Sequence, residues 1–226
     1  MPGAPWTARP RALADAHIEM IGVWDTVGAM GIPGAVFGNQ DAEEYRFRNK
    51  ALHPDVRAGY HAIAIDERRR QFKPTLWDAP APNQIIEQVW FAGVHGDVGG
   101  GKRVRRSSLS EITLAWMVDK AVAHRIQLSS EADYPHLLMS KASADCPMRT
   151  SWRPYRGRPA HRSIPQGATI ANSVAARMSA NRRYRPEMLI DPMTRTLGRG
   201  YPLADVVAIS PTTSIPLTPD LERTAS

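Results

Sequence analysis

The sequence holds a single cysteine, Cys146, among its 226 residues, so no disulfide within the chain is available to stabilise the fold. No apolar run approaches the roughly 18 residues that a membrane-spanning helix needs. Residues 1–16 contain Arg9 and Arg11 but no apolar stretch after them, which argues against a secretory signal peptide. We therefore expect a protein that is cytoplasmic as synthesised and that folds around a hydrophobic core.

Acidic residues are fewer than basic ones, since 22 Asp and Glu stand against 29 Lys and Arg and give a net charge of +7. Basic residues cluster in residues 68–70, 102–106, 149–162 and 182–185. Such clusters favour an anionic membrane surface or another polyanion, although an ordinary solvated surface is the simpler interpretation. Zinc-finger spacing and RNP-type aromatic motifs are missing, so we expect no specific nucleic-acid partner.

Two apolar runs end at chemically useful residues. The first, residues 21–28 (IGVWDTVG), contains Asp25, and the second, residues 89–101 (VWFAGVHGDVGGG), contains His95. Each is typical of a buried strand that runs into a turn bounded by glycine. Because chemistry in open α/β sheets collects at the carboxyl ends of strands, both side chains are candidates for one site. An acid followed by a histidine supplies two of the three members of a Ser–Asp–His triad.

Asp25 and His95 also fit structural or metal-binding roles. Asp25 could cap the turn through Thr26, and His95 could be a structural histidine bonded to backbone. Asp25, His95 and Asp97 could bind a divalent metal, but no local ligand spacing such as HExxH supports that site, and we expect no metal or cofactor. Residues 96–102 (GDVGGGK) match the start of a phosphate-binding loop, yet Arg103 stands where Ser or Thr is required.

The regular elements that the pattern predicts are few. We expect strands within residues 17–27 and 85–94, and a helix from Ser108 to about His124, with Glu111 completing a capping box. Residues 39–66 are expected to be mainly helical or irregular, because Pro54 suits a helix start and apolar residues follow it at helical spacing. A short helix is expected within 168–183. Two strands are too few for a self-sufficient sheet.

The remaining segments are expected to lie outside the core. Residues 28–38 are rich in glycine and predict a loop, and residues 135–167, rich in Pro, Arg and Ser, predict a loop, a cap or a partner surface. The domain organisation expected from these patterns is a disordered N-terminus over 1–16, one partial α/β domain over 17–190 and a loose tail over 191–226.

Several long blocks occur together in an order that resembles a known family. They are residues 21–29 (IGVWDTVGA), 60–69 (YHAIAIDERR), 72–77 (FKPTLW) and 89–101, with weaker blocks at 109–117, 172–177 and 184–189. The chain thereby resembles, over about residues 18–190, the uncharacterised α/β-hydrolase domain family that includes the type VI secretion phospholipase effectors. The resemblance implies the C-terminal half of an α/β-hydrolase sheet with flanking helices, and export by a type VI system.

The resemblance also implies an ester hydrolase that acts on phospholipids, with Asp25 as the triad acid and His95 as the triad base. The serine of such enzymes lies in a G-x-S-x-G elbow upstream of the Asp motif. No serine of this chain lies in that pattern, and the 24 residues before Asp25 contain none. Lys102 also stands where the family usually has an aromatic residue.

Three hypotheses follow from the missing serine. The first, which we favour, is that the chain is the C-terminal part of a phospholipase or lipid esterase and is inactive alone. The second is a non-catalytic module that docks to anionic membranes or to a partner chain. The third is complementation, in which a separate N-terminal chain supplies the serine and completes the sheet. Since a half-sheet exposes unpaired edge groups, some partner is expected in that case.

Overall fold

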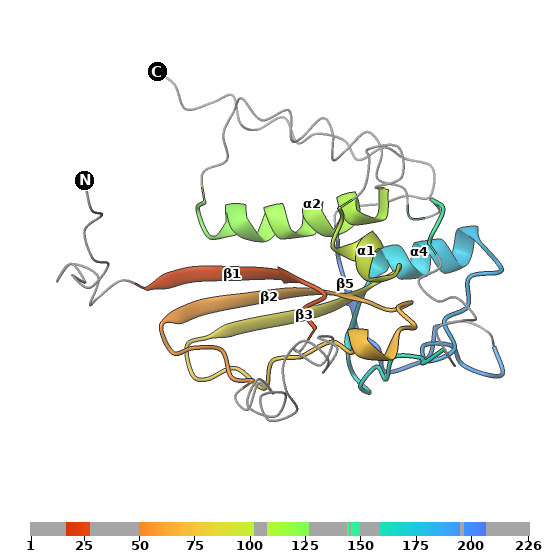
Figure 1. Ribbon diagram of the computed structural model, residues 1–226, viewed down its shortest axis with the longest axis horizontal. Helices are drawn as coiled ribbons and strands as arrows, with labels where there is room; N and C mark the ends of the chain where they lie inside the picture. Colours follow the sequence, from red (N-terminus) through yellow and green to blue (C-terminus); the bar gives the residue numbers. More distant parts are fainter. Residues whose placement is uncertain are drawn as a thin grey trace, which may run out of the picture.

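A five-stranded parallel sheet forms the centre of the protein. The computed structural model describes residues 17–27, 50–101, 108–126, 144, 146–149, 159–194 and 197–206. The strands follow one another in space in the same order as in the chain, and all neighbours pair in parallel. They are β1 (Ile18–Trp24), β2 (Val56–Ala64), β3 (Ile85–Phe91), β4 (Thr169–Ala171) and β5 (Leu203–Ala204) (Figure 1). Because every pair is parallel, the carboxyl ends of all five strands lie at one edge of the sheet.

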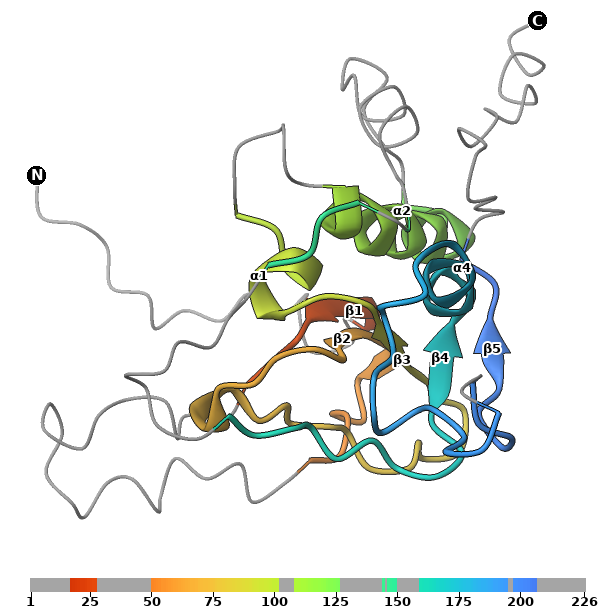
Figure 2. The same ribbon diagram turned by 90° about the vertical axis from the view of Figure 1, so that its right-hand side faces the viewer.

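Helices cover one face of this sheet. They are α1 (His95–Val98), α2 (Ser108–Ala123) and α4 (Asn172–Ala180), and all lie above the strands in Figure 2. The short 3₁₀ helix η3 (Arg70–Phe72) and the segment that leads into β4 lie on the other side of the strands. The α/β class expected from the sequence is confirmed, as a parallel sheet with flanking helices.

The core lies between α2 and the sheet. Trp90, Phe91 and Trp116 are at most 2% exposed, and the rings of Phe91 and Trp116 meet edge to face with centroids 5.5 Å apart. Gly22 allows close packing of β1 on the helix, because a Cβ there would lie 2.5 Å from Sδ of Met117.

The prediction of a helix after Pro54 is wrong. Residues 56–64 form β2, a strand whose nine residues are buried except Arg57, and which pairs with β1 on one side and β3 on the other. A central parallel strand is buried on both faces, so its apolar residues run almost continuously and do not alternate. Periodicity alone does not separate such a run from a buried helix.

The sheet also contains two strands that sequence patterns did not predict. Residues 169–171 form β4 before the helix expected in this region, and residues 203–204 form β5, within the segment expected to be a loose tail. Both are very short, and their pairing with neighbours in the sheet, rather than their own composition, makes them strands. The division of the chain into domains stays a prediction.

The segment expected to be a surface loop reaches the core where it is described. Arg162 and Ile164 are 7% and 6% exposed, and Ile164 belongs to the main hydrophobic cluster. The expectation of a segment outside the core is therefore wrong for Arg162 and Ile164, whereas the other residues of 159–167 are exposed or half-buried. The predictions for residues 1–16 and 28–38, for most of 135–158 and for the side chain of Ser108 lie outside the described residues. No helix in the described part of the chain has the length and apolar character needed to cross a membrane.

Candidate active site

Asp25 and His95 meet at the carboxyl edge of the sheet. Asp25 follows the last residue of β1, and His95 is the first residue of α1, which begins four residues after β3 ends. The distance between Oδ2 of Asp25 and Nδ1 of His95 is 2.7 Å, a short charge-assisted hydrogen bond. The structure thus brings together the two residues that the sequence singled out, although 70 residues separate them.

The backbone at Asp25 holds the carboxylate in place. Its φ of 45° lies in the left-handed region, which residues other than glycine rarely adopt and which is concentrated at functional sites. The N–H of Asp25 donates to the carbonyl of Ala62, and the N–H of Thr26 donates to Nε2 of His61 at 3.0 Å. The side chain is fully buried, and its Oδ1 accepts from the N–H of Ala64. The turn is therefore fixed against β2.

Arg162 pairs with both oxygens of the Asp25 carboxylate. Its Nη1 donates to Oδ1, and its Nη2 lies 2.8 Å from Oδ2. Burial by itself would raise the pKa of Asp25, but the hydrogen bond from His95 and the ion pair with Arg162 outweigh it and lower the pKa from 3.8 to about 2. Asp25 is thus ionised at neutral pH, as the acid of a triad must be.

Three carboxylates fix the turn that carries His95. The N–H groups of residues 93, 94 and 95 each donate to a different acidic side chain. The acceptors are Asp66 for Gly93 at 2.7 Å, Asp97 for Val94 at 3.2 Å and Glu67 for His95 at 3.2 Å. Each of these acids is also bonded elsewhere: Asp66 by the Tyr184 hydroxyl, Glu67 by Arg69 and Asp97 by Arg149. We call Asp66, Glu67 and Asp97 the carboxylate frame.

Gly93 permits this turn, and replacing it should destabilise the protein. Its φ is 121°, and a Cβ there would lie 2.7 Å from Cβ of Asp97. We expect Gly93→Ala to lower the free energy of unfolding by about 2 kcal/mol or more, through backbone strain together with overpacking. Urea denaturation measures this loss. Gly167→Ala is the matched control, because its φ of 78° is also strained but nothing lies within 4 Å of its Cβ. Equal losses in both variants would show that the contact with Asp97 adds no cost.

The imidazole of His95 is packed on one side and open on another. The ring of Phe72 contacts it edge to face with centroids 4.9 Å apart, and the guanidinium of Arg69 lies 3.5 Å above the Phe72 ring. The side chain of His95 is 33% exposed, and none of the described residues forms a hydrogen bond with its Nε2. Since ionised Asp25 can only accept, Nδ1 carries the proton and Nε2 offers a lone pair. A general base needs this arrangement.

The contacts of Asp97 do not support a metal site at the His95 turn. Its carboxylate accepts from the N–H groups of Val94 and Arg149 and also pairs with the Arg149 guanidinium. Among the described residues, no group of three or more potential ligands could hold a metal ion. Of residues 96–102, which match the start of a phosphate-binding loop, the first three belong to α1. Gly100 and Gly101 take positive φ values of 79° and 91°.

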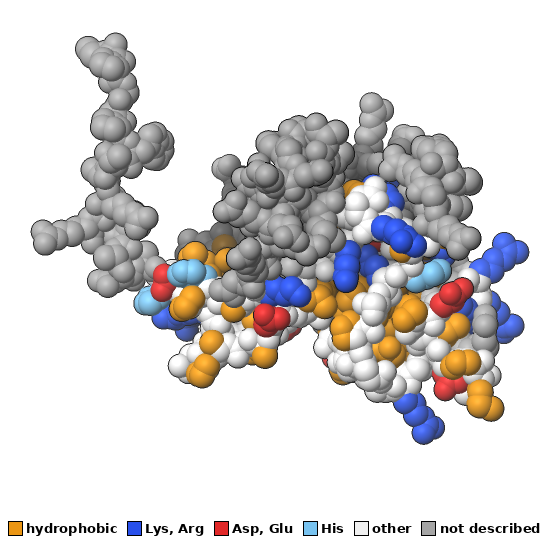
Figure 3. Space-filling model, turned by 60° about the horizontal axis from the view of Figure 1, so that its bottom comes forward, with side chains coloured by type: hydrophobic (Ala, Val, Ile, Leu, Met, Phe, Trp, Pro, Cys, Tyr) orange, Lys and Arg blue, Asp and Glu red, His pale blue; other side chains and the backbone are white. Residues whose placement is uncertain are grey.

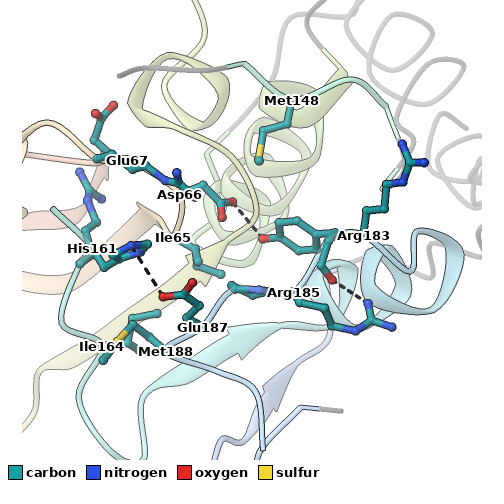
Figure 4. A pocket seen from close by; sticks show the side chains of 14 residues that line it. Ile65, Asp66, Glu67, Met148, His161, Ile164, Arg183, Arg185, Glu187 and Met188 are labelled. Carbon is teal, nitrogen blue, oxygen red and sulfur yellow. Dashed lines mark hydrogen bonds and ion pairs between the residues drawn. The ribbon is translucent and has the colours of Figure 1, made fainter. Parts of the chain in front are cut away.

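A cavity of about 180 Å³ lies beside the two candidate residues. Glu67 and Arg162 line it and also bond to His95 and Asp25, so the cavity adjoins the site. In its wall the Tyr184 hydroxyl donates to Oδ2 of Asp66. Nε2 of His161 lies 3.7 Å from a carboxylate oxygen of Glu187 (Figure 4). Both polar and apolar side chains therefore line the cavity, and two pairs of the polar ones contact each other.

Sequence reasoning missed Arg162, Asp66 and Glu67, and it considered Asp97 only as a possible metal ligand. Arg162 lies in a segment rich in Arg and Pro, where one buried arginine has no local signature. Asp66 and Glu67 belong to a dense run of charges that is typical of a solvated surface, yet Glu67 is 1% exposed. The one sequence feature that could have indicated their burial is that Asp66 and Glu67 directly follow an apolar run. A charge buried at such a position requires a partner.

Comparison with known proteins identifies the family to which the chain belongs. A family model described as T6SS, phospholipase effector Tle1-like, catalytic domain, matches residues 7–120, which is 114 of the 226 residues. No curated protein matches the chain significantly, and no solved structure does. The matched range contains both Asp25 and His95 but ends before Arg162. Since the match spans half of the chain, the protein belongs to the Tle1-like family of type VI secretion phospholipase effectors.

Proposed function

We propose that Asp25 and His95 are the acid and the base of a serine-type triad that hydrolyses an ester bond of a phospholipid. The observation that carries this proposal is the 2.7 Å contact between Oδ2 of Asp25 and Nδ1 of His95. It joins an ionised, buried acid to an imidazole whose second nitrogen is unpaired among the described residues. Membership of a phospholipase effector family supports a lipid substrate.

The chemistry follows from the two nitrogens of His95. Nε2 accepts the proton of the serine hydroxyl while the serine oxygen attacks the ester carbonyl and forms a tetrahedral intermediate. The imidazolium then gives that proton to the departing alkoxide as the acyl–oxygen bond breaks. Water, activated by the same nitrogen, hydrolyses the acyl-serine ester and restores the enzyme. Asp25 holds the Nδ1–H tautomer throughout and stabilises the imidazolium.

We infer that the nucleophile lies on a segment outside the 226 residues. None of their serines lies in a G-x-S-x-G sequence. β1 stands at one end of the sheet, and in the described ranges it pairs only with β2. A further parallel strand on this open edge would place the turn at its carboxyl end next to Asp25. Either an upstream part of the same reading frame or a complementing chain could provide it.

Hydrolysis of fluorogenic phospholipid vesicles tests this proposal. We expect the 226-residue chain alone to show no turnover, and the chain translated together with its upstream reading frame to be active. A fluorophosphonate probe, whose phosphorus is attacked by an activated serine with loss of fluoride, should label the longer protein in the added segment and leave the 226 residues unlabelled. Labelling of a serine within the 226 residues would contradict an external nucleophile. An upstream frame without a serine elbow would contradict a nucleophile from the same reading frame and leave only a complementing chain.

A second candidate function is a non-catalytic module that docks to anionic membranes. The net charge is +7, and the face shown in Figure 3 carries Lys and Arg side chains close to hydrophobic ones. Met193 is 94% exposed, and Met188 and Leu203 are 44% and 49% exposed. Basic side chains near an anionic bilayer contribute about 1 kcal/mol each, and exposed apolar side chains add to the attraction by insertion.

Co-sedimentation with vesicles separates the second function from the first. If the protein is a docking module, it should bind vesicles that contain phosphatidylserine at low salt and release them as salt rises, because the attraction is screened. Vesicles of phosphatidylcholine alone are the control. Binding to anionic vesicles together with an inactive longer protein would favour the docking module, whereas absence of binding at low salt would rule it out.

A further inference from the structure

Arg162 lies at the centre of the candidate site but outside the range that matches the family model. Its side chain is 5% exposed, and its two terminal nitrogens make four contacts. They donate to both oxygens of Asp25, to the carbonyl of Ala64 at 2.6 Å and to the carbonyl of Phe72 at 2.6 Å. Two of these partners stand at the end of β2 and in η3, so one guanidinium connects three separate parts of the chain.

We propose that Arg162 is the positioning residue of the site, and that it fixes the plane of the Asp25 carboxylate so that Oδ2 points at Nδ1 of His95. A guanidinium is planar and presents its donors as a rigid fork that matches a carboxylate. Because the same fork is held by two backbone carbonyls, the carboxylate cannot turn without breaking contacts to β2 and η3. Arg162 does not touch the reacting atoms in this scheme and acts through Asp25.

The surroundings of Asp25 show why such a partner is needed. The carboxylate is fully buried, and its other hydrogen-bond donors are His95 and the N–H of Ala64. His61, the other titratable group near it, is neutral at pH 7 because burial lowers its pKa to about 4. Arg162 therefore supplies the only permanent positive charge among the described groups bonded to Asp25. An unpaired buried carboxylate would take up a proton and then donate a hydrogen bond, which no longer orients Nδ1–H.

Arg177 offers a matched control for this proposal. It is 4% exposed, and its Nη1 donates to the carbonyls of Ala144 and Cys146 at 2.6 and 2.8 Å. It is thus a second buried arginine that connects segments through carbonyl groups, but it makes no contact with Asp25. Replacing either arginine removes a buried cation with structural contacts, so a loss of stability is expected from both. Only Arg162 should affect the Asp25–His95 pair.

NMR measures the protonation of Asp25 and the tautomer of His95 directly, so the experiment does not depend on enzymatic activity. Carbon-13 titration follows the Asp25 carboxyl, and nitrogen-15 spectra of the imidazole report the tautomer of His95, assigned with His95→Asn. For Arg162→Gln we expect the Asp25 pKa to rise by about one unit or more and the Nδ1–H tautomer to lose its preference. Arg162→Lys keeps the positive charge but not the planar pair of donors, so it should raise the Asp25 pKa less than Arg162→Gln does. Arg177→Gln should leave both signals as in the wild type.

The role of Arg162 rests on the proposed function, but the two can fail separately. If Arg162→Gln unfolds the protein, the Asp25 pKa and the His95 tautomer are compared between Arg162→Lys and Arg177→Gln instead. If Arg162→Gln leaves the carboxyl titration and the tautomer unchanged, or Arg177→Gln changes them equally, the positioning role is overturned while the triad stands. If Arg162→Gln shifts both signals, but phospholipid hydrolysis by the longer protein does not need Asp25 and His95, the positioning role holds and the proposed function fails.

Discussion

Replacing His95 with alanine should lower kcat for phospholipid hydrolysis by about 10⁶-fold in the proposed active form, in which an additional segment supplies the serine. The physical reason is that Nε2 of His95 is the proposed acceptor of the serine proton, and that no other histidine among the described residues forms a hydrogen bond with Asp25. Asp25→Asn should lower kcat by about 10⁴-fold, since an amide in place of the carboxylate favours the wrong tautomer of His95. KM should change little in both variants, because neither side chain is proposed to bind the lipid.

Steady-state hydrolysis of short-chain phospholipids measures these losses. His53→Ala is the matched control, because the side chain of His53 is 71% exposed and pairs only with the neighbouring Asp55 among the described residues. We expect its kcat to equal that of the wild type. Thermal unfolding of each variant separates a chemical loss from an unfolded protein. A decrease of about tenfold or less for His95→Ala, in a folded variant, would contradict the role of His95 as the general base.

Acidification from pH 6.5 to 4 should cost the protein about 3 kcal/mol through His61 alone. Burial lowers the pKa of His61 from 6.5 to about 4, while nearby Asp25 acts in the opposite direction and Arg162 in the same one. Above pH 6.5 the imidazole is neutral in both the folded and the unfolded chain, so it costs nothing. Between pH 6.5 and 4 only the unfolded chain takes up the proton, and the free energy of unfolding falls by about 1.4 kcal/mol per pH unit.

The comparison that isolates this effect is with His61→Gln. Glutamine cannot be protonated in this range, and its side-chain oxygen can accept the N–H of Thr26, as Nε2 of His61 does at 3.0 Å. Urea denaturation at several pH values gives the free energy of unfolding of both proteins. We expect the stability of the wild type to fall more steeply than that of the variant between pH 6.5 and 4, and the two to run parallel below pH 4. Equal slopes over that range would show that His61 is not the group responsible.

The carboxylate frame affects how variants of this protein are interpreted. Asp66, Glu67 and Asp97 bind the backbone of the turn that carries His95, so their loss would displace the base without removing any reacting group. Replacing one of them could imitate the loss of a catalytic acid. Readouts of His95 orientation, such as the tautomer signal, separate such a residue from Asp25.

Local sequence patterns were sufficient to identify the family, the α/β class and the two residues proposed for catalysis. Each strand and the turn that follows it are contiguous in the chain, so an apolar run that ends at Asp25 or His95 is visible without any knowledge of the fold. The family signature is likewise built from contiguous blocks, and the match to residues 7–120 confirms the assignment.

The surroundings of those two residues, in contrast, depend on contacts between distant segments. Residues 56–64 were expected to be helical or irregular and form a central strand, because burial on both faces removes the alternation that marks a strand. Arg162 meets Asp25 across 137 residues, and its burial is compensated by partners from three separate segments. A charged side chain in a loop has the same local pattern whether it is solvated or buried. The pairing that compensates its burial exists only once the sheet, η3 and the segment before β4 have come together.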